Sequence, residues 1–284
     1  MNDKMKNLII RTASGLVMLA VLLGATLHSF ESFALLGLLI LVGGMWEFYK
    51  LAQDEQVTPL RYMGLTMGIL LFGFFYFWLN PESHQEAIGS RMLILLAAIL
   101  LLAFLTFIVE LFGKGGNLVA NVGTTLLGVL YVALPTSLLL SFPFLATGGW
   151  DPRALLGFIF IIWSNDVFAY LTGITIGRHK MCPTISPKKS WEGFVGGVIG
   201  AVAMGYATSV VLEADTLMWC GLALVAAITG VVGDLTESQL KRKAGVKDSG
   251  NIIPGHGGVL DRFDALILAT PFVCVFILFV KLFS

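Results

Sequence analysis

The stretch RMLILLAAILLLAFLTFIVELF, residues 91–112, is charged only at Arg91 and Glu110 and is otherwise almost wholly apolar. Roughly 20 such residues in an α-helix cross about 30 Å of hydrocarbon. Backbone groups in lipid must bond to one another, so only helices and closed barrels span a bilayer. The stretch therefore predicts a membrane-spanning helix.

Similar apolar runs recur along all 284 residues, of which 57% are hydrophobic and only 13% charged, with a mean hydropathy of +0.86. An ordinary soluble domain is about a quarter charged. The alternating pattern of transmembrane β-strands is absent, so we expect an all-α, polytopic membrane protein. A break is expected in the fifth span, which carries Gly128 and Pro135. The nine predicted spans cover residues 8–27, 31–50, 60–79, 91–112, 118–143, 154–176, 190–212, 216–235 and 262–282.

The basic residues predict the orientation of these spans. With a cytoplasmic N-terminus on an uncleaved first helix, only Arg91, Arg153 and Lys281 of the 18 Lys and Arg lie outside. Cytoplasmic loops are rich in Lys and Arg, so this orientation is favoured over its inverse.

Two regions follow from the positions of the loops. Residues 1–150 hold the first five spans, and residues 151–284 hold a catalytic region of four spans with cytoplasmic connections at 177–189 and 236–261. Many of the basic residues lie in or beside these connections. Contact with anionic headgroups would explain the basic residues alone but not the acidic ones among them.

The acidic residues gather towards the same inner side. Asp234 and Glu237 precede Lys241 at helical spacing, so a helix that continues past span eight would place them on one face. Carboxylates among Lys and Arg suit Mg²⁺ with phosphates, because Mg²⁺ prefers oxygen ligands and leaves positions for substrate. The predicted metal ligands are Asp234 and Asp261, supported by Asp166 and Glu237.

Simpler interpretations exist for several acidic residues. Glu237 and Lys241 are spaced as an ordinary helical salt bridge. Asp264, three residues after Asp261, has the spacing to pair with Arg262 or a neighbouring helix. Glu47 and Glu110 have the positions of interfacial residues near the inner ends of spans two and four.

The segment ISPKKSWEG, residues 185–193, predicts an anion site. Lys188 and Lys189 lie just before span seven, where the amides of a helix N-terminus bind anions. Ser190 could instead serve only as the N-cap, with Glu192 in the first turn. Further along, Gly193, Gly196, Gly197 and Gly200 have the spacing of close helix packing, from which a homodimer is also expected.

A longer pattern runs through Ser238–Arg242, Lys247–Asp248, Gly250, Pro254–Gly258 and Asp261–Asp264. It closely resembles the signature of the phosphatidate cytidylyltransferase family. The segments SNDVFAYLTGITIGR and ISPKKSWEG are also similar to family elements, so the likeness covers residues 162–265 at motif quality. The first half of the chain matches only as hydrophobic spans.

The resemblance implies an Mg²⁺-dependent transfer of CMP from CTP to phosphatidic acid in the bacterial cytoplasmic (inner) membrane, with the active site facing the cytoplasm. No nucleic-acid partner is expected. His256 would contact phosphate, although a role within its own loop is equally open. The implied catalytic residues are Asp234, Asp261, Lys241, Arg262 and His256, and the implied substrate-binding residues are Ser186, Lys188, Lys189, Ser190, Ser238, Arg242, Lys247, Gly257 and Gly258.

Two other functions stay open. A CTP-dependent kinase of polyprenol or phytol type would share related sequence patterns, but it would need a base to activate a neutral alcohol. A secondary transporter could use Asp166 and Asp234 for ion coupling, but it predicts paired repeats that the sequence lacks.

Overall fold

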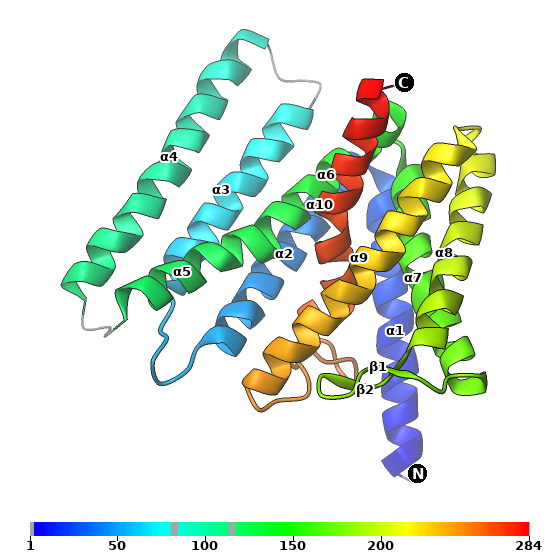
Figure 1. Ribbon diagram of the computed structural model, residues 1–284. Helices are drawn as coiled ribbons and strands as arrows, with labels where there is room; N and C mark the ends of the chain where they lie inside the picture. Colours follow the sequence, from blue (N-terminus) through cyan, green and yellow to red (C-terminus); the bar gives the residue numbers. More distant parts are fainter. Residues whose placement is uncertain (1–2, 81–84, 114–116, 284) are drawn as a thin grey trace. The chain divides into compact units, whose positions relative to one another are not determined.

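The computed structural model describes residues 3–80, 85–113 and 117–283. Within these ranges, nine helices are long and apolar enough to cross a membrane, which confirms the predicted all-α, polytopic fold. The helices are labelled in Figure 1. Eight of the predicted spans correspond to α1 (Asp3–His28), α2 (Phe30–Ala52), α3 (Arg61–Leu79), α4 (Gln85–Phe112), α7 (Pro152–Thr175), α8 (Trp191–Leu212), α9 (Thr216–Lys243) and α10 (Leu260–Phe283).

The fifth span is interrupted, as its glycine and proline predict. It consists of α5 (Leu118–Gly128), a π-helical turn η1 (Val129–Ala133) and α6 (Leu134–Thr147). Tyr49 on α2 packs at this point, and its hydroxyl donates to the Thr125 carbonyl at 2.7 Å. A Cβ at Gly128 would lie 2.5 Å from the Tyr49 ring, so only glycine admits the ring here.

The helix α9 continues beyond the apolar run, as predicted. It ends at Lys243, and Gly245 follows in the left-handed conformation with φ +68°. Glycine adopts this conformation without steric cost, which explains why the helix stops there. The polar residues 234–242 are therefore carried on regular helix.

The connection 177–189 contains a small hairpin that the sequence did not predict. Strands β1 (Lys180–Cys182) and β2 (Ser186–Ser190) pair antiparallel, and β2 leads directly into α8. Glu192 fixes the hairpin's start, since its carboxylate accepts hydrogen bonds from the Arg178 and His179 amides and lies 2.6 Å from the His179 ring. The hairpin gives the lysines before α8 a defined backbone.

The chain packs as two compact units. Of the described residues, those of Met1–Ala25, Phe30–Ser141 and Lys243–Arg262 form unit 1. Those of Thr26–Ser29, Phe142–Arg242 and Phe263–Ser284 form unit 2. Packing therefore assigns residues 243–262 to the unit that holds most of the first spans. The catalytic region 151–284 stays a prediction.

Unit 2 is built around the pair α7 and α8, which lie side by side in Figure 1. The predicted glycine face of α8 makes this contact: Gly196 faces Thr172, Gly197 faces Asn165 and Gly200 faces the Phe168 ring. The absence of side chains allows the two helices to approach closely. Packing within the chain therefore accounts for the glycine spacing, and the expected homodimer loses the observation on which it rested.

Candidate functional site

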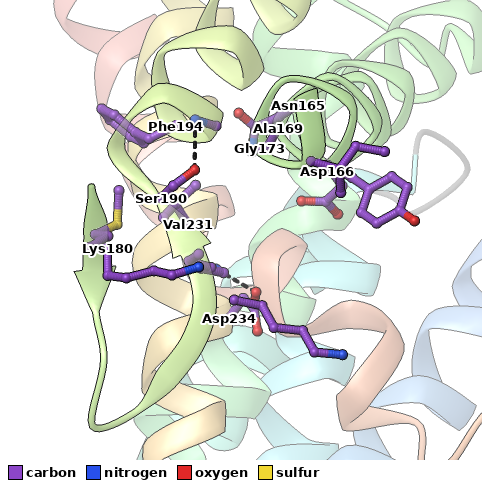
Figure 2. A pocket seen from close by; sticks show the side chains of 15 residues that line it. Asn165, Asp166, Ala169, Gly173, Lys180, Ser190, Phe194, Val231 and Asp234 are labelled. Atoms are coloured by element: carbon purple, nitrogen blue, oxygen red, sulfur yellow. Dashed lines mark hydrogen bonds and ion pairs between the residues drawn. The ribbon is translucent and has the colours of Figure 1, made fainter. Parts of the chain in front are cut away.

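A pocket of about 480 Å³ lies within unit 2, between α7, the hairpin, α8 and α9. Figure 2 shows Asp166 of α7 and Asp234 of α9 on different walls of it, with Lys180 reaching in from β1. Predicted site residues thus meet in one place, although they are up to 68 positions apart in the chain. The pocket is lined by Asn165, Asp166, Ala169, Tyr170, Gly173, Ile174, Lys180, Met181, Lys188, Lys189, Ser190, Gly193, Phe194, Val231 and Asp234.

Lys189 and Asp234 form an ion pair across this pocket. Their side chains are 25% and 38% exposed, so the pair borders open space rather than the interior. Ser238 Oγ donates to Asp234 Oδ1 at 3.3 Å from the next turn of α9. Asp234 is therefore held between a lysine of the hairpin and a hydroxyl of its own helix.

Asp234 also belongs to a cluster of three carboxylates with Glu237 and Asp264. One oxygen from each lies within 4.8 Å of the others. Glu237 is 1% exposed and pairs with Lys241 at 2.5 Å, which confirms the predicted salt bridge. Gly233 allows the third member to approach, because a Cβ there would lie 2.6 Å from the Asp264 carbonyl oxygen.

This cluster fits a hard divalent cation. It offers only oxygen donors, which Mg²⁺ prefers, and two of its three members are largely buried. Asp234 and Glu237 are in the predicted metal set and Asp166 lines the adjoining pocket, but Asp264 is outside that set. The sequence signals for Asp264 were its spacing from Asp261 and its place at the end of the family-like pattern.

The lysines before α8 lie where the sequence placed them. Ser190 is the N-cap of α8, since its Oγ accepts from the Gly193 amide at 3.2 Å, and it also lines the pocket. Lys188 is exposed at the pocket rim, and Ser186 opens β2. Ser190 is thus both an N-cap and a pocket residue, and its predicted contact with an anion stays a prediction.

The signature loop, residues 247–262, lies in unit 1 and is tightly bonded to itself. Asp261 Oδ2 accepts from the amides of Ser249 and Gly258, both at 2.8 Å. Arg262 Nε donates to the His256 carbonyl at 2.9 Å. The Gly258 amide is thus used inside the loop, and its expected contact with substrate stays a prediction.

The backbone of His256 bonds within its own loop, and its ring contacts the first helix. Its Nδ1 lies 2.8 Å from Ser14 Oγ, and Arg11 Nε donates to the neighbouring Gly255 carbonyl at 3.0 Å. Gly257 has φ +87°, and its carbonyl accepts from the Ile253 amide. Arg242 and Lys247 are exposed. The facing of Asp234 and Asp261 across one metal stays a prediction, since they belong to different units.

Comparison with known proteins extends the likeness beyond the signature. A sequence model of the cytidylyltransferase family matches residues 9–280. The chain belongs to this family. The match includes the first five spans, which the sequence alone had related to the family only by their hydrophobicity.

Three curated relatives of this cytidylyltransferase-family chain are named phosphatidate cytidylyltransferase. The Bacillus subtilis protein is 35% identical over 83% of this chain and 86% of its own length. The Rickettsia bellii protein is 34% identical over 78% of this chain and 92% of its own length. The Haemophilus influenzae protein is 31% identical over 95% of this chain and 98% of its own length. The chain is thus similar to these bacterial proteins over nearly their whole length.

One buried carboxylate of unit 1 lies outside every motif of the cytidylyltransferase-like pattern described above. Glu47 of α2 is 2% exposed, and its carboxylate bonds to the signature loop in unit 1. The sequence placed it near the inner end of span two as an interfacial residue, which stays a prediction. The structure adds that its side chain is buried against residues more than 200 positions away. Its only sequence signal was a charge inside an apolar run.

Proposed function

We propose that this protein transfers CMP from CTP to phosphatidic acid, giving CDP-diacylglycerol and pyrophosphate. The observation that carries the proposal is the charge arrangement in unit 2, where Lys189 and Lys241 pair with carboxylates of one cluster beside a pocket. The three relatives described above, all named phosphatidate cytidylyltransferase, support the choice of substrates.

The reaction needs positioning of charge more than a base. A phosphate oxygen of phosphatidic acid forms a bond to the α-phosphorus of CTP, and the bond from that phosphorus to the bridging oxygen of the β-phosphate breaks. The attacking oxygen is already anionic near neutral pH, so no proton must be removed from it. Two polyanions must nevertheless be held together, and charge on the leaving pyrophosphate must be stabilised.

The pocket supplies groups for holding phosphates. Lys188 and Lys189 lie at the N-terminus of α8, so they offer ammonium groups to an anion where the helix dipole also favours negative charge. Tyr170 and Ile174 line the pocket from α7 and are 67% and 62% exposed. Since exposed apolar faces of spanning helices meet lipid, phosphatidic acid would reach the pocket from the bilayer past these residues.

The carboxylates Asp234, Glu237 and Asp264 would hold Mg²⁺. Bound there, the ion would offset charge on transferring phosphates. The lysines paired with this cluster would turn to phosphate oxygens when substrate binds. Asp166, Asp261, Arg262 and His256 keep their predicted roles, with the site facing the cytoplasm of a bacterial inner membrane.

The test uses purified protein in lipid nanodiscs with phosphatidic acid, Mg²⁺ and CTP labelled at the α-phosphate. We expect label in CDP-diacylglycerol and release of pyrophosphate. CTP labelled at the γ-phosphate is the matched control, and it should leave the lipid unlabelled. Label passing from the γ-phosphate to a polyprenol or phytol would show a lipid kinase instead and would overturn the proposal.

A further inference from the structure

Glu47 lies in the middle of a set of hydrogen bonds that begins in span two and ends in the signature loop. Its Oε1 accepts from the Val259 amide at 3.0 Å, and its Oε2 accepts from the Leu260 amide at 2.8 Å. These amides begin α10, where N–H groups have no partner within the helix. A carboxylate of another helix thus serves as the cap of α10.

Ser249 connects Glu47 to the predicted catalytic carboxylate. Ser249 Oγ lies 2.9 Å from Glu47 Oε2 and 2.9 Å from Asp261 Oδ2. A hydroxyl has one hydrogen, so it can donate to only one of these oxygens at a time. The position of Asp261 is therefore linked through one side chain to the position of Glu47.

Two signature glycines are explained by the same carboxylate. A Cβ on Gly250 or on Gly258 would collide with the Glu47 carboxylate, and on Gly258 also with Ser249 Oγ. These positions therefore require glycine because the loop wraps closely around a buried carboxylate. The loop and Glu47 form one fitted structure in unit 1.

We propose that Glu47 is a positioning residue for the transfer reaction: it holds residues 249–260 in the conformation that fixes Asp261 and, through the loop, Arg262. The inference rests on the proposed function. Burial of a carboxylate costs free energy unless hydrogen bonds satisfy its oxygens. The hydrogen bonds described for the Glu47 carboxylate all come from residues 249–260. The first half of the chain thereby contributes to chemistry assigned to the second half.

Glu47→Gln is the sharpest variant, because its amide nitrogen cannot accept from the loop amides. Glu110→Gln is the matched control: Glu110 is also buried in unit 1, but it accepts from Asn121 Nδ2 and bonds to no signature-loop residue among the described contacts. Ser249→Ala removes the hydroxyl that contacts both carboxylates but keeps the Ser249 amide bond to Asp261. It serves as a second variant should Glu47→Gln fail to fold.

The measurements are kcat, KM for each substrate, the Mg²⁺ concentration for half-maximal activity, and amide hydrogen exchange of residues 249–260. For Glu47→Gln we expect kcat to fall about 10- to 100-fold and the Mg²⁺ requirement to rise, as for groups that orient metal ligands. Ser249→Ala should also lower kcat and raise the Mg²⁺ requirement, but by smaller factors. The double variant should have the same kcat and Mg²⁺ requirement as Glu47→Gln alone. Amide hydrogen exchange of residues 249–260 should be faster in Glu47→Gln than in wild type. The control Glu110→Gln should have the kcat of wild type.

The outcomes separate two failures. A wild-type protein that makes no CDP-diacylglycerol overturns the proposed function. An active wild type whose Glu47→Gln and Ser249→Ala variants keep kcat, Mg²⁺ dependence and loop exchange overturns this inference alone. A Glu47→Gln variant with normal kinetics, whose only change is a lower unfolding temperature, also overturns it.

Discussion

The ammonium of Lys189 pairs with the carboxylate of Asp234, joining the strand that leads into α8 to the polar end of α9. The pair connects a candidate phosphate-binding group to a candidate metal ligand. Because both side chains remain partly exposed, substrate can reach them without unfolding of the surrounding helices.

Lys189→Ala should lower kcat about 100-fold or more, the loss typical of removing one group that stabilises transition-state charge. Lys50→Ala, which removes an exposed lysine at the end of α2, is the control and should retain activity. Initial rates with CTP and phosphatidic acid in nanodiscs measure both. A Lys189→Ala enzyme within twofold of wild type would show that the ion pair is only structural.

Asp264→Asn should weaken metal binding, because it removes one of three carboxylate charges while keeping the side chain's size. We expect the Mg²⁺ requirement to rise about 10- to 100-fold, taking the range for groups around metal sites. Mn²⁺ binding followed by electron paramagnetic resonance gives a readout independent of turnover. Asp54→Asn is the control, since Asp54 only caps a turn through the Gln56 and Val57 amides and asparagine can do the same. Equal Mn²⁺ affinity in both variants would remove Asp264 from the site.

Gly196→Ala should destabilise unit 2 by about 1–3 kcal/mol, the usual cost of overpacking. Its new methyl group would collide with the Thr172 side chain of α7. The control is Gly73→Ala in α3, where nothing lies within 4 Å of the added carbon and helix propensity favours alanine. Thermal unfolding in detergent compares the two, and equal stability would contradict the packing described for α7 and α8.

Asp151 gives a prediction for pH dependence. It caps α7 through the Arg153 amide at 2.8 Å, and the hydrogen-bonded Arg153 guanidinium lowers the pKa of the Asp151 carboxyl. A carboxyl whose pKa is lower in the folded state stabilises the protein above the unfolded pKa of about 3.9. This contribution is lost as the pH falls through the folded value.

The matched variant is Asp151→Asn, which keeps a capping oxygen but loses the charge. Wild type should unfold at a higher temperature than the variant at neutral pH, and the difference should shrink as the pH falls below about 3.9. A gap that stays constant over that interval would mean that the ion pair contributes no stability.

The spans could be predicted because hydrocarbon imposes length and apolarity on each segment separately. Even the break after Gly128 and the extension of α9 to Lys243 followed from local residues. The lysines before α8 were also predictable, because a serine N-cap and two adjacent ammoniums are consecutive in the chain. These features depend on neighbours in sequence.

The missed features depend on neighbours in space. Asp264 joins Asp234 only because Gly233 allows α9 to approach α10 closely, and no periodicity reports such a contact. From the sequence, Glu47 had the position of an interfacial residue. Its contacts with the signature loop could not be predicted, because its bonding partners follow it by more than 200 residues. The hairpin at 180–190 was missed because its strands are three and five residues long and have no alternation.

Two positions of the pocket wall, Gly173 and Gly193, have no side chain at all. Substitution there can only add atoms, so this wall can be narrowed by mutation but cannot be widened. A Cβ at Gly173 would make ordinary contact with Ser190 Oγ at 3.5 Å, whereas one at Gly193 would lie 2.8 Å from the Ala169 carbonyl oxygen. Gly173 is therefore the place to engineer discrimination against bulky headgroups, with alanine as the smallest step.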